Sequence, residues 1–468
     1  MSLYPQRPTF GTVLRSFGSA DGLPFADALS EEDINNACKE EGVDFANGPD
    51  DVYTPAVTLW AFVAQCLSAS KSCVAAVARV VVLRFALGLP VCSAGTGGYC
   101  KARPKLPESL LGRLTCQVGG GVESQAPDSW RWHNRCVKLA DGCELSMPDT
   151  PANQAEYPQS KSQKPGLGFP HMRLVVLLAF ASACLIDAAM GACKGKGTSE
   201  TELFRKLLGS VAAGDVIVAD RFYCTWWLVA LLRERGADAC FRLHQKRHYD
   251  FSRGRQLGQG DHVVSWPKPE RPEWMDEQTY ARLPDQLEMR EVEVVVKTPG
   301  CRVRHLVAAT TLLDAQRYSA ADIADLYQKR WHVELDIRSI KQTLKMDILS
   351  CKTPAMVRRE VWTHLLGYNL VRKVLAQAAL AGQVKPRQLS FAGAVQTMNA
   401  FRWLLVTARA EDGARFVEVL LLAVGTHKVG NRPDRVEPRE VKRRPKKQKL
   451  LMRPRQQRRA ELLAGVGA

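Results

Sequence analysis

The chain has 468 residues, 46 % of them hydrophobic, which is enough for several domains with substantial cores. Its 65 Lys and Arg residues outnumber its 48 Asp and Glu residues, and the net charge of +17 favours a polyanionic partner such as nucleic acid. A membrane location is not expected, because the longest apolar stretch, 174–186, is too short to span a bilayer and the first residues lack the apolar core of a signal peptide.

The first expected unit is a helical N-terminal domain, residues 1–125. One helix is predicted to begin after Thr54, the next to end at Gly88-Leu-Pro90, and a third to cover 107–118. Short helices with basic loops favour a helix-turn-helix-like reader of DNA ends. An ordinary helical packing domain is the alternative, because the basic residues here are scattered rather than aligned.

The second unit, residues 126–243, places two aspartates on or after predicted strands. Residues 135–147 read as a strand interrupted at Asp141-Gly142, which puts Asp141 at or beside a tight turn. Residues 214–223 read as a short buried strand with Asp220 at its carboxyl end, where ligands gather in open α/β sheets. The remaining elements are an apolar run over 173–190, helices over 199–211 and 225–235, and a strand over 237–243. The order of these elements predicts an α/β, ribonuclease H-like mixed sheet with flanking helices: three strands, a helix, a strand, a helix and a strand.

Four other acids compete with these two. Asp187 lies on the predicted third strand, and Asp215 precedes its strand at the amino end. Asp149 lies in a Pro-rich turn, and Glu144 should point to the face of its strand opposite Asp141. Asp141 and Asp220 are therefore the preferred candidates.

Residues 244–312 form a β-rich insertion before the last part of the core. Gly- and Arg-containing turns and Pro-rich links separate alternating strands over 289–297 and 303–310. The core then resumes over 313–430 with a helical C-terminal region.

Residues 320–349 read as one long helix with an unusual polar face. The pattern Tyr-x2-Arg-x3-Glu-x6-Lys is formed by Tyr327, Arg330, Glu334 and Lys341, and Arg338 and Lys345 fall close to the same stripe. A lone carboxylate flanked by cations and a phenol is poorly suited to a core, but it suits a site where a metal-binding carboxylate meets a phosphate backbone. A solvated helix face is the alternative, and the fixed spacing together with the two aspartates decides against it.

The last unit, residues 431–468, is dense in basic residues. Pro445 and Pro454 are expected to break any helix, so the sequence predicts a disordered arm that contacts phosphates without regard to sequence.

Taken together, these motifs resemble the DDE transposases of bacterial insertion sequences, in particular the family numbered four. The resemblance covers roughly residues 130–380 and rests on Ala140-Asp141-Gly142, Val218-Ala-Asp220-Arg-Phe-Tyr223 and Tyr327-Gln-Lys-Arg-Trp-His-Val-Glu334. It implies that Asp141, Asp220 and Glu334 are the catalytic, metal-binding triad and that Tyr327, Arg330 and Lys341 contact DNA near the cleaved end. Arg338 and Lys345 are expected to extend that DNA contact. In some family members the β-rich insertion stacks a tryptophan on a flipped base, which makes Trp266 and Trp274 candidates, although a tryptophan is more often a core residue.

The chemistry needs no side-chain nucleophile. Two Mg²⁺ ions held by three carboxylates can activate a water, stabilise the leaving 3′ oxygen and then align a freed 3′ hydroxyl against a second DNA strand; Mn²⁺ should substitute. The sequence has no Gly-x-Ser-x-Gly motif and its 14 cysteines form no Cys-x-x-Cys pair, so zinc is not expected. The expected location is a reducing bacterial cytoplasm, near the nucleoid.

The expected function is cut-and-paste DNA transposition. The expected partners are double-stranded DNA, at terminal inverted repeats and in the target, and a second copy of the chain in the paired-end complex. A catalytically inactive DNA-binding descendant and a metal-dependent endonuclease without strand transfer are the alternatives.

Overall fold

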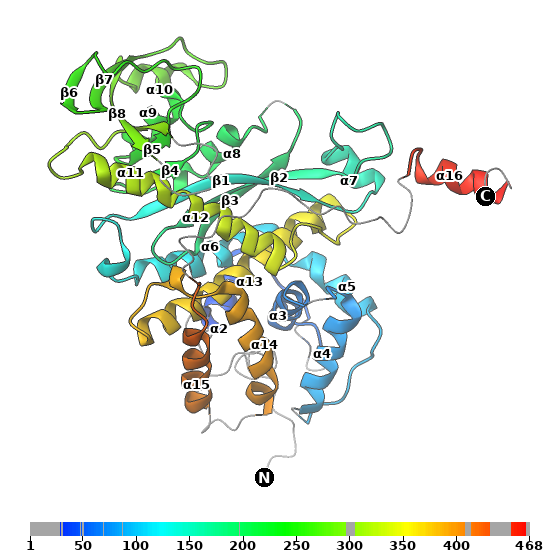
Figure 1. The fold of residues 1–468 in the computed structure, drawn as a ribbon. Coiled ribbons are helices and arrows are strands. Elements are labelled where there is room, and N and C mark those ends of the chain that lie inside the picture. Colours follow the sequence, from blue (N-terminus) through cyan, green and yellow to red (C-terminus); the bar gives the residue numbers. More distant parts are fainter. Residues whose placement is uncertain are drawn as a thin grey trace.

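The computed structural model describes residues 29, 31–46, 48, 51–68, 70–86, 88–195, 197–295, 305–407, 413–430 and 451–464. Nine strands form one mixed sheet in the order β3-β2-β1-β4-β5-β9-β8-β7-β6 (Figure 1). The strands are β1 (Val137–Ser146), β2 (His171–Ala179), β3 (Leu185–Ala192), β4 (Val216–Ala219), β5 (Asp238–Arg242), β6 (Arg255–Gly258), β7 (Asp261–Pro267), β8 (Gln286–Val295) and β9 (His305–Thr310).

The first five strands have the ribonuclease H-like arrangement. β1 pairs antiparallel with β2 and parallel with β4, β2 pairs antiparallel with β3, and β4 pairs parallel with β5. Between them run the helices α7 (Pro151–Glu156), α8 (Glu200–Lys206) and α9 (Trp226–Glu234) and the short 3-10 turn η3 (Leu208–Ser210). The predicted fold class is therefore confirmed.

The insertion is joined to this core through the sheet itself. β9 pairs antiparallel with β5 on one side and with β8 on the other, so β6 to β9 extend the central sheet rather than form a separate layer. α10 (Glu277–Arg282) covers part of the extension. The fully buried Arg290 of β8 pairs with Asp261 of β7 at 2.6 Å and donates to the Tyr318 carbonyl at 2.7 Å, which fixes the extension to the segment that leads into the next helix.

Helices cover both faces of the sheet, and alternate strand residues enter two cores. Leu139 of β1 packs with the helices of the C-terminal half and Ala140 packs with α8 and α9. The larger core is built around α13 (Pro354–Ala381), most of whose 28 residues are buried. This helix contacts α3 and α6 from the N-terminal region and α14 and α15 from the C-terminal region.

The N-terminal helices are α2 (Glu31–Glu40), α3 (Pro55–Cys66), α4 (Cys73–Ala86), α5 (Gly97–Ala102) and α6 (Glu108–Ser124), with 3-10 turns η1 (Arg103–Lys105) and η2 (Asp128–Trp130). Thr54 caps α3 as predicted, since its hydroxyl accepts from the Val57 N–H. α6 packs on both α13 and β3, so this region shares the core of the catalytic sheet.

The predicted long helix over 320–349 is interrupted. It consists of α11 (Ala320–Lys329), α12 (Trp331–Arg338) and a π-helical turn, η4 (Ser339–Thr343), with a break at Arg330. Lys345 follows the π turn with a positive φ of 56°, so it is not on the helical stripe where the sequence placed it.

After α13 come η5 (Pro386–Gln388), α14 (Phe391–Thr407) and α15 (Gly413–Thr426). In the tail, residues 431–450 lie outside the described part of the chain. The structure differs from the prediction at its end, where α16 (Arg455–Leu463) starts directly after Pro454. Proline is compatible with a helix start because its missing N–H has no intrahelical partner there. In the described residues no helix is both long and apolar enough to cross a membrane.

Candidate active site

Asp141 lies in the middle of β1 and not at a turn. β1 continues without interruption from Val137 to Ser146, and Asp141 is level with Val176 of β2. The predicted Asp-Gly turn is wrong because long-range pairing with β2 overrides the local preference of that dipeptide. Asp141 shares the strand face of Leu139, which is the face covered by α12, and its Oδ1 accepts from the Gly142 N–H at 2.8 Å.

Asp220 immediately follows β4, as predicted. The parallel register aligns Leu139 with Val218, so two residues further along both chains Asp141 is level with Asp220. The Asp220 carboxylate accepts from the Phe222 N–H at 2.8 Å, which fixes its orientation beyond the strand end.

Glu334 reaches the same place from α12. The Arg330 guanidinium lies between the acids, with Nη2 at 2.6 Å from Glu334 Oε1 and Nη1 at 3.7 Å from Asp141 Oδ2. A break in the helix at Arg330 therefore leaves a cation beside two carboxylates that are far apart in the sequence.

Burial dominates the electrostatics of Asp141. It raises the pKa of this carboxyl group to about 6, and the nearby Asp220 and Glu200 carboxylates add to the increase. The Gly142 N–H and the Arg330 guanidinium act in the opposite direction. The raised pKa of Asp141 is therefore chiefly a consequence of its burial.

Glu200 is a fourth acid that the sequence did not suggest. It is the first residue of α8, on the other face of the sheet, and its carboxyl group occupies the space that a side chain at position 142 would fill: a Cβ on Gly142 would lie 2.6 Å from the Glu200 carboxyl carbon. Burial raises the pKa of Glu200, and Asp220 and Glu144 contribute to the increase. Ser199-Glu200-Thr201-Glu202 reads only as a helix start, so no local signal marks Glu200.

The remaining stripe residues do not share one surface. Tyr327 is 6 % exposed and belongs to the core, so the expected DNA contact is not open to it. Lys341 donates to the Glu144 carbonyl at 2.8 Å at the end of β1, which keeps it near the acids. Arg338 is exposed and lies on the wall of a different cavity, beside Asp336 and Ser339.

The two tryptophans differ in environment. Trp266 is 4 % exposed, donates to Glu291 at 3.3 Å and has the Arg247 guanidinium 3.8 Å from its ring, so it is the core residue that the sequence left as an alternative. Trp274 is 43 % exposed, but the Arg205 guanidinium lies 3.8 Å from its ring.

The rejected acids have structural partners. Asp187 of β3 accepts a hydrogen bond from the Ser210 hydroxyl, and the buried Asp215 pairs with Lys138 at 2.6 Å. Asp149 accepts from Gln154 in the turn before α7. Glu144 is within 4 Å of His171 and Arg173.

The donor chemistry at this site fits hard divalent cations. Carboxylate oxygens from β1, the end of β4 and α12 are the ligands that Mg²⁺ and Mn²⁺ prefer, and a bound cation would favour the charged form of Asp141, whose pKa is raised mainly by burial. Within the described ranges no three His, Cys, Asp or Glu side chains are close enough to hold an ion as they stand. The cation now nearest to Asp141 and Glu334 is Arg330.

A ribonuclease H-like sheet with carboxylates on β1, at the end of β4 and on a following helix defines the class of nucleic-acid-cleaving and strand-transferring enzymes. Residues 132–370 match the family model described as "Transposase DDE domain". The chain belongs to the DDE transposase family, whose members cleave DNA, transfer strands and work with divalent metal ions.

Relatives extend this assignment over most of the chain. It is 30 % identical over 354 residues to the transposase InsG of insertion sequence element IS4 from Escherichia coli (strain K12), which covers 74 % of this chain and 76 % of the relative. A transposase of insertion sequence element IS421 from Escherichia coli is 32 % identical over 69 residues, 15 % of this chain and 19 % of the relative. A piggyBac transposase in a synaptic complex with hairpin DNA aligns with a TM-score of 0.41 at 9 % identity, over 90 % of this chain and 86 % of that chain.

Proposed function

We propose that this transposase moves an insertion sequence by a cut-and-paste route and that Asp141, Asp220 and Glu334 are its catalytic acids. One observation carries the proposal: the three carboxylates come from β1, the end of β4 and α12, and the first and last of them flank one guanidinium. The rejected acids have other partners.

The three carboxylates would hold the metal, for which we propose two Mg²⁺ ions with Mn²⁺ as a substitute. Bound in such a site, these ions supply an activated water and stabilise the leaving 3′ oxygen. The protein's own contribution is orientation. The Phe222 N–H holds the Asp220 carboxylate, and the Gly142 N–H holds that of Asp141.

The cations beside the acids are proposed to hold the DNA backbone. Arg330 offers a planar fork for two phosphate oxygens, and Lys341 lies at the end of β1 next to the site. The buried Tyr327 is proposed to fix the end of α11, and with it the position of Arg330. The DNA would be the element's terminal inverted repeats and then the target, held by a homodimer in the paired-end complex.

Single replacements of the acids test this proposal. Asp141→Asn, Asp220→Asn and Glu334→Gln should each abolish cleavage of an oligonucleotide that carries the element's end, while binding in a gel shift is retained, because they remove metal ligands and leave the DNA-binding surfaces intact. Asp149→Asn, at a rejected acid, is the matched control and should cleave normally.

Any of the three variants that nicks DNA at the wild-type rate would remove that residue from the triad. Strand transfer is measured in the same reaction with a target duplex. Cleavage by the wild-type protein without joined product would overturn the cut-and-paste assignment.

A further inference from the structure

A cavity of about 540 Å³ lies on the side of α12 that faces away from Glu334. Its walls come from α12, η4, η5, the first turn of α14 and the segment after α15. On an α-helix, Leu335, Asp336 and Ser339 project roughly 100–160° away from Glu334, so these residues face away from the three acids, whereas Arg338, at about 40°, lies on the edge of the cavity nearer to them.

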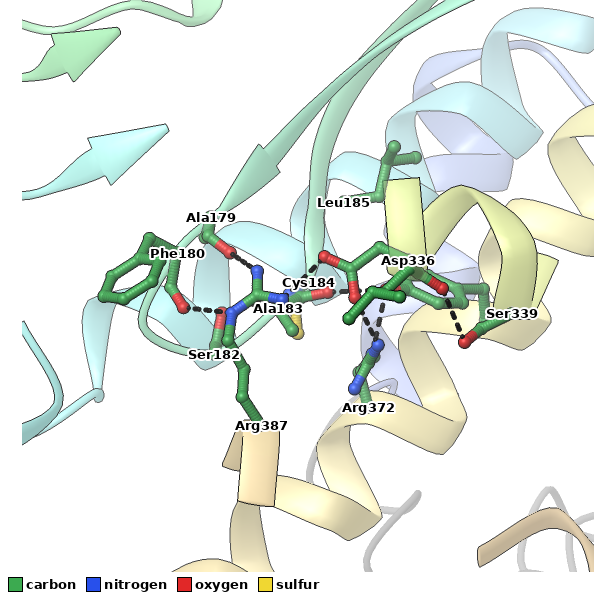
Figure 2. Close-up of polar contacts among 12 residues, drawn as sticks. Ala179, Phe180, Ser182, Ala183, Cys184, Leu185, Asp336, Ser339, Arg372 and Arg387 are labelled. Carbon is green, nitrogen blue, oxygen red and sulfur yellow. Dashed lines mark hydrogen bonds and ion pairs between the residues drawn. The ribbon is translucent and has the colours of Figure 1, made fainter. Parts of the chain in front are cut away.

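The floor of the cavity is a buried cluster with surplus positive charge (Figure 2). Arg372 and Arg387 donate to the two carboxylate oxygens of Asp336 at 2.6 and 2.8 Å. Arg387 also donates to the carbonyls of Ala179 and Phe180 at the end of β2, so its guanidinium is fixed in place. Because one carboxylate is shared by two guanidinium groups, the cluster has a net charge of +1 in a region of low dielectric.

The rim adds two more cations. Arg338 and Lys428 are both exposed, and neither forms an ion pair within the described residues. Among the described residues that line the cavity, Asp336 is the only acidic one, so four cationic side chains face one carboxylate there.

The start of α14 contributes in the same direction. Phe391 and Ala392, in its first turn, line the cavity, and the Ser390 hydroxyl caps the helix by accepting from the Gly393 N–H. The N-terminus of this 17-residue helix presents backbone N–H groups and a partial positive charge. Cations, a helix start and a concave shape together are suited to a phosphate group.

We propose that this cavity is a second DNA-contacting site, which binds a backbone phosphate of a strand that passes beside α12, outside the acid site. The inference rests on the proposed function, because it takes DNA as the source of the phosphate. It gives Arg338 a role at the cavity rather than on the catalytic stripe. Glu334 and the cavity share α12, so a strand bound here would be held by the same helix that presents the third acid.

The test compares two double variants that remove equal charge. Arg338→Ala with Lys428→Ala alters only the exposed rim and leaves the buried cluster intact. Lys206→Ala with Arg235→Ala removes one exposed lysine and one exposed arginine from the α8 and α9 side of the sheet. Binding to an oligonucleotide that carries the inverted repeat bordering the gene is measured by fluorescence anisotropy across a range of salt concentrations.

The rim variant should bind on the order of 10-fold or more weakly near 0.1 M salt, and its slope of log affinity against log salt should fall by about 0.9, for the one lost phosphate contact. The control should change much less. A scan of single neutral methylphosphonate linkages should find a position that weakens the wild-type protein but not the rim variant.

Equal weakening by both double variants, or wild-type affinity of the rim variant, would overturn the proposal. A cavity that takes only a free phosphate would also leave DNA affinity unchanged, and that result counts against the proposal. Wild-type cleavage of the same oligonucleotide is measured in parallel. If the wild-type protein cleaves the oligonucleotide but the rim variant binds it normally, only the cavity proposal fails. If the rim variant binds more weakly but the wild-type protein never cleaves, only the proposed function fails.

Discussion

At the scale of single residues, the acid site is defined by the burial of its carboxyl groups. Burial is the largest cause of the raised pKa of Asp141, the Asp220 and Glu200 carboxylates add to that increase, and Arg330 is the cation closest to Asp141 and Glu334. Such an arrangement is unfavourable for the fold by itself and becomes favourable when a cation binds, which is common where active sites are maintained at a cost in stability.

The raised pKa of Asp141 predicts a pH-dependent stability. Its value of about 6 lies above the ordinary 3.8, so the folded protein favours the protonated acid and loses stability as pH rises from about 4 to about 6. Asp141→Asn removes this loss. Without metal, it should raise the free energy of unfolding by about 2 kcal/mol above pH 6 and change it little below pH 4.

Urea denaturation in EDTA at several pH values measures the effect, with Asp149→Asn as the control. A gain for Asp141→Asn that is the same at pH 4 and pH 7.5 would show that desolvation of the carboxylate is not its cause.

The sequence predicted the positions of Asp220 and Glu334 on their elements but placed Asp141 at a turn that the structure does not have, and it did not predict the surroundings of the three acids. Strand ends and helix spacing are local properties that a single chain reveals. Glu200 could not be found in this way. Its carboxyl group can lie against β1 only because Gly142, far away in the sequence, has no side chain. Burial of Tyr327 and Trp266 likewise depends on what packs against them.

At the scale of elements, α6 and α13 hold the catalytic sheet to the N-terminal helices. Asn369 of α13 donates to the Thr115 carbonyl of α6 and to the Leu185 carbonyl of β3, and its own amide oxygen accepts from the Leu185 N–H. Gly119 lets α6 approach β3 closely enough for this bridge, since a Cβ there would lie 1.9 Å from the Leu185 carbonyl oxygen.

Two adjacent glycines in α6 should therefore respond in opposite ways to alanine. Gly119→Ala should destabilise the protein by about 2–4 kcal/mol, because the methyl group displaces β3 and breaks the bridge to Asn369. The methyl group added by Gly120→Ala would enter open space, so this substitution should stabilise α6 by about 0.5–1 kcal/mol. Thermal unfolding of the two variants beside the wild type measures both; a stable Gly119→Ala protein would mean that α6 and β3 are not in contact.

The helix predicted over 320–349 shows what periodicity misses at this scale. The 3.6-residue pattern is present, but a π turn from Ser339 to Thr343 rotates the residues after it off the expected face. Lys345 was misplaced for this reason, whereas Glu334 and Arg338 lie in α12, before the π turn.

At the scale of the whole molecule, the expected domains are less separate than composition indicated. The insertion shares the central sheet and the N-terminal helices share the core of α13. Pairing between β5 and β9 joins residues some 70 positions apart, and no local pattern reports it. The five expected domains, with their four boundaries, remain proposals for that reason.

The basic C-terminal tail should act on DNA binding as a whole. Deletion of residues 435–468 should weaken binding to all DNA sequences alike and flatten the dependence of log affinity on log salt by about 0.9 for each lost phosphate contact. Anisotropy with the inverted-repeat oligonucleotide and with a random duplex measures this. A selective loss of affinity for the inverted repeat would instead make the tail a reader of sequence.

The continuity of the nine-stranded sheet has a mechanical consequence. From the outermost hairpin, β6 and β7, an unbroken ladder of backbone hydrogen bonds passes through β8, β9, β5 and β4 to the strand that carries Asp141. Strands in a ladder resist sliding past one another far more than they resist a change of twist. A force applied by a ligand at the hairpin would therefore reach the strand that carries Asp141 as a twisting of the sheet.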